Sequence, residues 1–383
     1  MKILLATNYL KGSLSAVEAA NIIKKAALSV DSELEIEKIP IADGGDGTLD
    51  AIKLYTDFEE KISQVSDPLN REILAKWLII NYNGEKTAII EASQACGLSL
   101  LKSEEYNPLK TTTFGVGELI NQAAENYCKK IIITVGGSST NDGGAGILQA
   151  LGIELLDKNN NPIPQGGEGL KNFESINISE LNPKLKDVKI IVACDVKNPL
   201  CGKNGASFIY APQKGANPEQ VKILDNNLSK FADLTAKITG KDYKNLEGTG
   251  AAGGISFALK SFLNAELISG FSFIADISKL EDKIKDSDFV ITTEGRLDSQ
   301  TLEGKAPFQV AQLAKKYNIP TFLIAGSIEK GLNLKNSGIT KAFSMTDENV
   351  SQKNSIKNAS NFLENIAIQV INHIKSKDTE QIL

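Results

Sequence analysis

The chain has 383 residues, of which 42% are hydrophobic and 23% are charged, a composition typical of a soluble protein with room for two domains. Its formal net charge of -5 gives no general attraction to nucleic acid, and no apolar run approaches the length of a membrane span, so neither partner is expected. The first residues enter a predicted strand without a signal-peptide layout, and the four cysteines lack metal-type spacing, which favours free thiols and a cytoplasmic location.

The N-terminal stretch alternates strands and helices. Its pattern predicts a strand, a helix and a second strand at Lys2–Thr7, Ala16–Val30 and Leu34–Ile41. The loop Ala42–Thr48 follows, with two aspartates among three glycines, and a helix is expected over Leu49–Tyr55. Such a loop suits either a site for Mg²⁺ and a phosphate together or a turn with capping aspartates.

The next region is hairpin-like, so we take it as the start of a second, α+β part. Its predicted strands are Lys61–Asp67, Ile73–Tyr82 and Thr87–Glu91. A helix is expected from Thr111 to Asn126. The apolar, β-branched segment Ile131–Val135 then predicts a strand buried on both faces.

The loop after that strand is the most informative part of the chain. Val135–Gly144 reads Val-Gly-Gly-Ser-Ser-Thr-Asn-Asp-Gly-Gly and leads into a helix predicted to begin at Ala145. Glycines let backbone amides approach an anion, and a helix N-terminus adds unpaired N–H groups and partial positive charge. The loop therefore suits phosphate binding, with Asp142 as N-cap or facing a cation. The alternative is a tight turn that Asp142 caps.

The rest of the chain returns to strands followed by helices. The predicted elements are the strands Val188–Cys194, Asp288–Thr293, Thr321–Ala325 and Lys341–Ser344 and the helices Pro218–Thr239, Ala306–Tyr317 and Ser355–Lys375. Because this rhythm repeats that of the start, we predict an α/β fold in which residues 1–65 and 285–383 form one domain. Residues 66–284 are then an inserted second α/β domain, and the active site is expected in the cleft between the two.

The sequence contains a single histidine, His373, which is interpreted as a solvated residue on an amphipathic helix beside Ile371 and Ile374. A Ser–His–Asp hydrolase, a Cys–His enzyme and a His-ligated zinc site are therefore disfavoured. Acid–base chemistry would fall to carboxylates or lysines.

Gly248–Gly253 matches the dinucleotide pattern G-x-G-x-x-G, but the preceding Asp242–Glu247 is polar and unlike the buried strand that this motif needs. An NAD-linked hydroxy-acid dehydrogenase is therefore disfavoured, and the lack of a central histidine argues against it as well. The sequence contains neither a P-loop nor a protein-kinase catalytic loop.

Several features point together to phosphoryl transfer. Glycine turns follow predicted strands at Gly44, Gly136 and Gly295, and in open α/β sheets such strand ends gather on one edge. Aspartates cluster at these ends: Asp43, Asp46, Asp142, Asp195 and Asp298. Lys11 and Arg296 add positive charge. These groups suit a phosphorylated ligand, a metal ion and a carboxylate base, although each one alone is explained by capping or salt bridging.

The motifs resemble those of the bacterial type I glycerate kinases over nearly the whole chain. The similar segments are Lys11–Ala16, Ala42–Thr48, Gly136–Gly144, Cys194–Leu200 with Gly205-Ala206, Pro212–Ala216, and Gly295–Asp298 with Gln300-Thr301. The resemblance implies ATP-dependent phosphorylation of D-glycerate to 2-phosphoglycerate with Mg²⁺, by a monomer or homodimer of two α/β domains, one of them flavodoxin-like.

Residue chemistry suggests a catalytic or binding role for each candidate residue. Arg296 pairs with the glycerate carboxylate, and Lys11 neutralises the transferring phosphoryl group. Asp195 or Asp43 accepts the hydroxyl proton or holds Mg²⁺, Asp298 could equally be the base, and Asp46 is a further metal ligand. The expected ATP-phosphate cradle is Gly136, Gly137, Ser138, Ser139, Thr140 and Asn141.

The chain departs from the family pattern at two places. Asn8-Tyr9 stand where the family usually has Asp-Ser, with Leu10 in place of Phe, and Asp46 stands in place of Glu. The missing aspartate at position 8 leaves a catalytically impaired glycerate- or sugar-acid-binding regulator as an alternative. Phosphorylation at O3 is a second alternative, because the sequence does not show which hydroxyl is phosphorylated.

Overall fold

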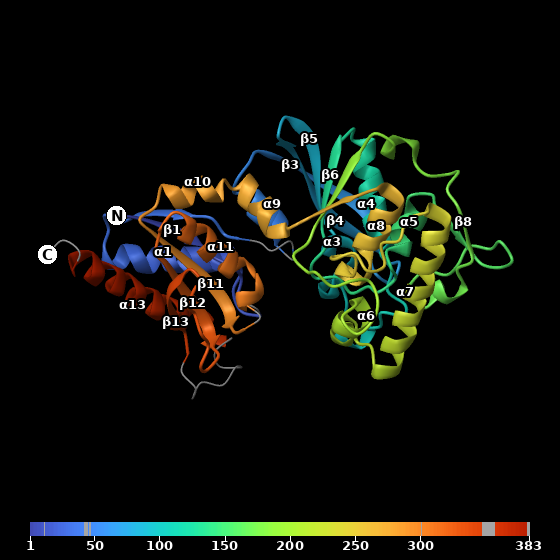
Figure 1. Cartoon of the computed structure of the whole chain (residues 1–383). Helices are drawn as coiled ribbons and strands as arrows, with labels where there is room; N and C mark the ends of the chain where they lie inside the picture. The colour runs from blue at the N-terminus through green and yellow to red at the C-terminus, as the bar shows by residue number, and fades with distance from the viewer. Residues whose placement is uncertain (11, 42–44, 46, 300, 347–356, 381–383) are drawn as a thin grey trace. The chain divides into compact units, whose positions relative to one another are not determined.

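A computed structural model describes residues 1–10, 12–41, 45, 47–299, 301–346 and 357–380 (Figure 1). The chain divides into two compact units. The first unit combines Met1–Asp43 with Phe271–Leu383, and the second unit is Gly44–Gly270. Within the described residues, no helix combines the length and apolar character that a membrane span requires.

The first unit is built on a five-stranded parallel sheet in the order β13-β12-β11-β1-β2. Its strands are β1 (Lys2–Ala6), β2 (Glu35–Lys38), β11 (Phe289–Leu297), β12 (Thr321–Ile328) and β13 (Ile339–Ser344). Counted along the chain within this unit, the spatial order is 2-1-3-4-5, which is the flavodoxin-like arrangement. The predicted α/β class, with a flavodoxin-like sheet formed by both termini, is confirmed.

Helices cover both faces of this sheet because its strands are apolar on both sides. Phe322 and Ile324 pack in one cluster with α1 and α13, whereas Leu323 and Ala325 pack in a second with α11. α1 and α13 lie side by side (Figure 1). The helices of this unit, together with α9 at its start, are α1 (Ala16–Val30), α9 (Gly270–Ile277), α10 (Leu280–Lys285), α11 (Ala306–Lys316) and α13 (Ala359–Glu380).

Ser15 caps α1 in a complete capping box with Glu18, which agrees with the predicted start of this helix at Ala16. His373 is not a solvated side chain. It is half-buried on α13, with its ring edge-on to Phe322 and Phe343 at centroid distances of 6.0 and 5.7 Å. The amphipathic pattern placed the helix correctly but could not show that two aromatic rings lie beneath this residue.

The second unit contains a six-stranded sheet in the order β10-β9-β6-β5-β4-β3. The four strands from β10 to β5 are parallel, and β4 and β3 add antiparallel strands. The strands of this unit are β3 (Phe58–Ser66), β4 (Glu72–Tyr82), β5 (Glu85–Glu91), β6 (Lys130–Thr134), β9 (Lys189–Ala193), β10 (Glu266–Ile268) and the separate pair β7 (Glu154–Leu156) and β8 (Ser175–Asn177).

Apolar helices pack against this sheet and against each other. Val116, Leu119 and Ile120 of α4 are fully buried with the strand residues Ile131 and Ile133. The helices of the second unit are α2 (Thr48–Ile52), α3 (Ser93–Cys96), α4 (Phe114–Glu125), α5 (Ala145–Ala150), α6 (Ala206–Tyr210), α7 (Pro218–Thr239) and α8 (Ile255–Leu263).

The unit boundaries differ from those drawn from the sequence. β3 contains the expected boundary at residue 65, yet it pairs with β4 along its whole length in the second sheet. At the other end, α10 belongs to the first unit although it lies in the part expected as the insertion. The sequence pattern does not reveal where the first unit ends. The reason is that α2, which belongs to the second unit, continues the alternation of strands and helices that begins in the first.

Candidate active site

The carboxyl ends of the parallel strands in the second unit gather several chemically active residues on one edge. Thr134, the last residue of β6, pairs with Glu91 of β5 on one side and with Ala193 of β9 on the other. Gly136 lies two residues after Thr134, and Asp195 lies two residues after Ala193, so each residue follows one of two neighbouring strands. The structure therefore brings the glycine loop and one of the candidate bases together.

The glycine loop is accessible only at its beginning. Gly137 is exposed and Gly136 is partly buried, whereas Ser138, Ser139, Thr140 and Asn141 are at most 6% exposed. The amides of Gly136 and Gly137 donate no hydrogen bond within the described part of the chain. The prediction that all six residues line a phosphate site is therefore too broad, because the hydroxyl and amide side chains turn into the protein.

The buried half of the loop is held by neighbouring segments. Ser139 donates from both its amide and its hydroxyl to the carbonyl of Cys96, at 2.8 and 2.9 Å. Thr111 Oγ1 donates to the Ser139 carbonyl, and Asn141 Nδ2 donates to Ser207 Oγ, each at 2.9 Å. These contacts fix the backbone that presents Gly136 and Gly137.

Asp142 is fully buried and organises the end of the loop. Its carboxylate accepts hydrogen bonds from the amide and hydroxyl of Thr113 (2.9 and 2.8 Å), from Gly144 N (3.0 Å) and from Gly146 N (3.2 Å). Burial raises the pKa of this carboxyl above its ordinary value, and the four donors oppose that shift. The N-cap residue of α5 is Gly144, so Asp142 is not the N-cap itself, but its carboxylate bonds to backbone amides at the start of this helix as a capping side chain does.

Asp195 follows β9, and its Oδ1 accepts a hydrogen bond of 2.6 Å from Ser269 Oγ, which follows β10. The pairing of β9 with β10 brings these two residues together. Ser269 did not stand out in the sequence because Glu266–Ile268 is too short to be recognised as a strand.

Glu91 is a second functional candidate that sequence reasoning missed. This residue, 3% exposed at the end of β5, accepts hydrogen bonds from Gly47 N (3.3 Å) and Leu49 N (3.1 Å) and from the Ser93 hydroxyl. It therefore anchors the start of α2, directly after the aspartate- and glycine-rich loop. The signal in the sequence that could have pointed to Glu91 is a charged residue at the end of an otherwise apolar strand.

The second glycine-rich segment has a structural role. Gly253 O accepts from Gly143 N at 2.9 Å, and a Cβ at Gly253 would lie 2.2 Å from the Thr140 carbonyl oxygen. This segment therefore packs directly against the first loop, and the close approach requires glycine. Its match to the dinucleotide pattern arises from this packing.

In the first unit, the carboxyl ends of β1 and β11 meet at the point where the strand order reverses, which is where flavodoxin-like sheets bind ligands. Asn8 N donates to Thr293 Oγ1 at 2.9 Å, and that hydroxyl donates back to the Asn8 carbonyl. Asn8 is 4% exposed, and its side-chain oxygen accepts from Tyr9 N. At this position, therefore, asparagine serves to hold the turn after β1.

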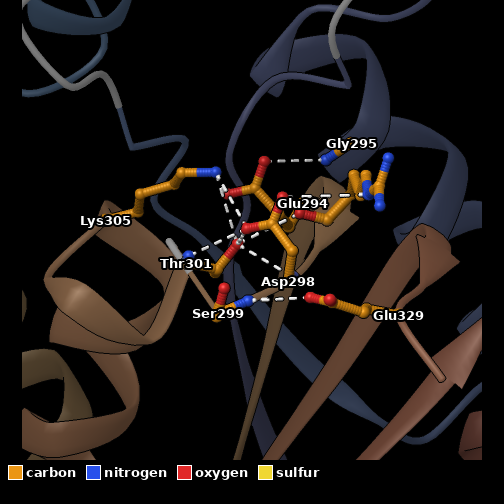
Figure 2. Close-up of polar contacts among 8 residues, drawn as sticks. Glu294, Gly295, Asp298, Ser299, Thr301, Lys305 and Glu329 are labelled. Carbon is orange, nitrogen blue, oxygen red and sulfur yellow. Dashed lines mark hydrogen bonds and ion pairs between the residues drawn. The ribbon is translucent and has the colours of Figure 1, made fainter. Parts of the chain in front are cut away.

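Arg296 lies in a longer strand than expected, because β11 continues to Leu297 and Arg296 pairs with Ser327 of β12. Its side chain is 67% exposed, and its Nε lies 3.8 Å from Asp298 Oδ2. Lys305, at the N-cap of α11, places its Nζ 3.5 Å from Asp298 Oδ1. Figure 2 shows the Lys305 side chain directed toward Asp298 and Thr301. Two cations thus flank one carboxylate.

The geometry favours a positioning role for Asp298. Its Oδ1 accepts from the amide (3.0 Å) and hydroxyl (3.1 Å) of Thr301. Burial acts to raise the pKa of Asp298, but the Thr301 hydrogen bonds and Lys305 lower it below its ordinary value. A carboxylate with a lowered pKa is a weaker base. Asp298 therefore holds the turn between Arg296 and Lys305. Lys305 did not stand out in the sequence.

Lys11, Asp43 and Asp46 lie outside the described residues. Within the residues that are described, no group of three or more His, Cys, Asp or Glu side chains gathers as a metal site. The expected metal ligands Asp43 and Asp46 are therefore left untested.

Comparison with known proteins identifies the family. A model described as "Glycerate kinase family" matches residues 3–375. The chain belongs to the glycerate kinase family. It is 46% identical to "Glycerate 2-kinase" of Escherichia coli (strain K12) over 90% of both chains, and 40% identical to "Glycerate kinase" of Bacillus subtilis (strain 168) over 99% of both. The resemblance seen in the motifs is confirmed, and the protein is an enzyme.

A solved structure agrees with this assignment. The crystal structure of a "putative glycerate kinase 2" from Salmonella typhimurium LT2 superposes with a TM-score of 0.82 at 41% sequence identity, covering 99% of each chain. The two chains therefore share this fold along nearly their whole length.

We expect Asp142→Asn to lower the free energy of unfolding of the second unit by about 3 kcal/mol, because the amide replaces a charged acceptor of four hydrogen bonds. Trp77, the only tryptophan, is fully buried in β4 and reports on this unit by fluorescence during urea unfolding. Asp187→Asn, at an exposed residue of the same unit, should change stability by less than about 0.5 kcal/mol. Equal effects of the two substitutions would contradict the assigned role.

Proposed function

We propose that the protein transfers the γ-phosphoryl group of ATP to the 2-hydroxyl of D-glycerate, with Mg²⁺, to give 2-phosphoglycerate. The observation that carries this proposal is the 46% identity to a relative named glycerate 2-kinase over 90% of both chains. Asp195 and Arg296, at the carboxyl edges of the two sheets, support the proposal because a carboxylate and a guanidinium are groups that such a transfer would use.

In the second unit, the amides of Gly136 and Gly137 would donate hydrogen bonds to ATP phosphate oxygens, since both glycines are at least partly exposed and their amides have no acceptor within the described part of the chain. Asp195, which follows the neighbouring strand β9, would accept the proton of the glycerate hydroxyl. Ser269 would orient the Asp195 carboxylate through its hydrogen bond. A loose transition state asks mainly for positioning and charge neutralisation, which this edge can provide.

In the first unit, Arg296 would pair with the glycerate carboxylate. It is one of two arginines in the chain; the other, Arg71, is already paired with Asp67 and Glu105 at 2.5 and 2.7 Å. The planar guanidinium suits a two-pronged contact with a carboxylate, and an exposed ion pair at 3.8 Å to Asp298 is weak enough to yield to a ligand. Lys11 would neutralise the transferring phosphoryl group.

Magnesium in phosphoryl-transfer sites is commonly held by one or two carboxylates together with substrate phosphates. The carboxylates of Asp43 and Asp46 are donors of the kind that Mg²⁺ prefers, and Asp195 is the alternative ligand. Mg²⁺ held by these residues would supply positive charge that neutralises the charge developing during transfer. Glu91, by anchoring the start of α2, would support the adjacent loop.

The proposed activity is tested by incubating purified protein with ATP, Mg²⁺ and D-glycerate and recording ³¹P NMR spectra of the product. Phosphorylation at O2 gives a phosphorus signal split by one methine proton, whereas phosphorylation at O3 gives a signal split by a methylene pair. We expect the methine pattern. The methylene pattern would reassign the product to 3-phosphoglycerate, and no new phosphate ester would refute the kinase assignment.

We expect Arg296→Lys to raise the KM for glycerate by about tenfold or more while changing the KM for ATP much less. Lysine keeps the charge but loses the planar fork. Arg71→Lys is the matched control, because Arg71 lies in a separate ion-pair network, and it should leave both KM values near those of the wild type. Equal changes in both KM values for Arg296→Lys would mean that Arg296 does not bind the substrate carboxylate.

We expect Asp195→Asn to lower kcat by about 10²- to 10⁴-fold, the range of a positioned general base, because the amide still accepts from Ser269 but cannot take a proton. Asp298→Asn keeps an acceptor for Thr301 and should lower kcat less than tenfold. Steady-state kinetics at saturating substrates decide between them. The reverse order of effects would assign the base to Asp298, and two small effects would leave Asp43.

A further inference from the structure

A buried lysine bonds to the glycine loop. Lys214 ends the short helix η5 (Pro212–Lys214), which follows α6, and it is 3% exposed. Its Nζ donates to Ser138 Oγ at 2.9 Å and to the Thr140 carbonyl at 2.7 Å. The amino group therefore contacts the two residues on either side of Ser139, within the buried half of the loop.

The position of Lys214 is determined by the turn that follows it. Gly215 has a φ of 96°, and a Cβ there would lie 2.4 Å from the Tyr106 carbonyl oxygen, so only glycine fits. Ser207 of α6 adds its hydrogen bond from Asn141 Nδ2. The segment from α6 to Gly215 thus forms a rigid support for the loop.

The loop around Lys214 contains polar groups that the protein itself does not satisfy. Thr140 Oγ1 and Asn141 Oδ1 are buried and have no hydrogen-bond partner within the described part of the chain. Lys214 itself bonds to a hydroxyl and a carbonyl, and no carboxylate lies within ion-pair distance of it among the described residues. A buried amino group without a bonded anion is costly, and buried cations are normally paired.

Burial lowers the pKa of Lys214 to about 8. The titratable groups that face it are the Cys96 thiol and the Asp142 carboxyl, and both act in the opposite direction, to raise the pKa. Lys214 therefore loses its proton at a lower pH than an exposed lysine does when no anion is bound.

We propose that Lys214 is a positioning residue for the glycine loop and the buried counter-charge of the phosphate that the loop binds. Its amino group holds Ser138 and Thr140, and it takes up a proton from solvent when a nucleotide phosphate reaches Gly136 and Gly137. This inference rests on the proposed function, because it requires the loop to bind a nucleotide.

The coupling follows from charge. An anion beside a partly neutral amine in a low-dielectric site favours the ammonium form, so the pKa of Lys214 rises on binding and a proton moves from buffer to Nζ. No other bond changes. Well below pH 8 the lysine is already charged and no uptake occurs. Above pH 8 the affinity for nucleotide falls, since binding must then be accompanied by protonation.

The proton is measured by isothermal titration of the full-length enzyme with Mg·ADP at pH 8.0, in two buffers of different ionisation enthalpy. Wild-type protein should take up a measurable fraction of a proton per nucleotide, and the uptake should fall as the pH is lowered. Lys214→Met should take up none and should bind ADP about ten- to hundredfold more weakly. Lys222→Met, at an exposed lysine of α7, should retain the wild-type uptake and affinity.

Kinetics provide a second measurement. Lys214→Met should raise the KM for ATP and leave the KM for glycerate unchanged, a separation that general destabilisation would not produce. If that variant does not fold, the wild-type titration alone decides. An active wild-type enzyme that binds ADP without proton uptake overturns the role of Lys214. A wild-type protein that neither binds ADP nor phosphorylates glycerate overturns the proposed function instead.

Discussion

The buried carboxylate of Asp142 is the interaction on which the candidate site depends. One side chain accepts from the start of α4 through Thr113 and from the start of α5 through Gly144 and Gly146. It joins two helices and the glycine loop at one point inside the protein. A buried carboxylate is tolerated only when donors surround it, so all these backbone groups must be in place together. Gly136 and Gly137 are the partly exposed residues at the start of the loop that Asp142 holds in place.

Much of the fold could be read from local patterns. The α1 bounds Ala16–Val30 and the α7 bounds Pro218–Thr239 agree with the sequence prediction because each helix has a clear capping residue and an amphipathic face. The β6 strand and the glycine loop after it were recognisable from β-branched residues followed by glycines. The family motifs likewise identified the enzyme class from the sequence alone.

The rest depended on contacts between segments far apart in the sequence. Glu91 bonds to the start of α2, Ser269 to Asp195, and Lys214 to the glycine loop, and none of these pairs has a local signature. Likewise, nothing in the loop itself showed which of its polar side chains would turn inward. Strands of three residues, such as β7 and β10, carry too little pattern to be recognised. Burial and pairing, which sequence periodicity does not specify, decided these positions.

The pairing of β1 with β11 has a consequence for how the protein is made. Ile3 lies beside Phe289, so the edge of β1 that pairs with β11 can be covered only after residues near the far end of the described chain have been synthesised. The second unit, a continuous segment from Gly44 to Gly270, can close its own sheet in the meantime. β1 and β2 can pair with each other early, but the other edge of β1 keeps its backbone N–H and C=O groups unpaired until β11 has been made, and an open strand edge is prone to pairing with a wrong partner.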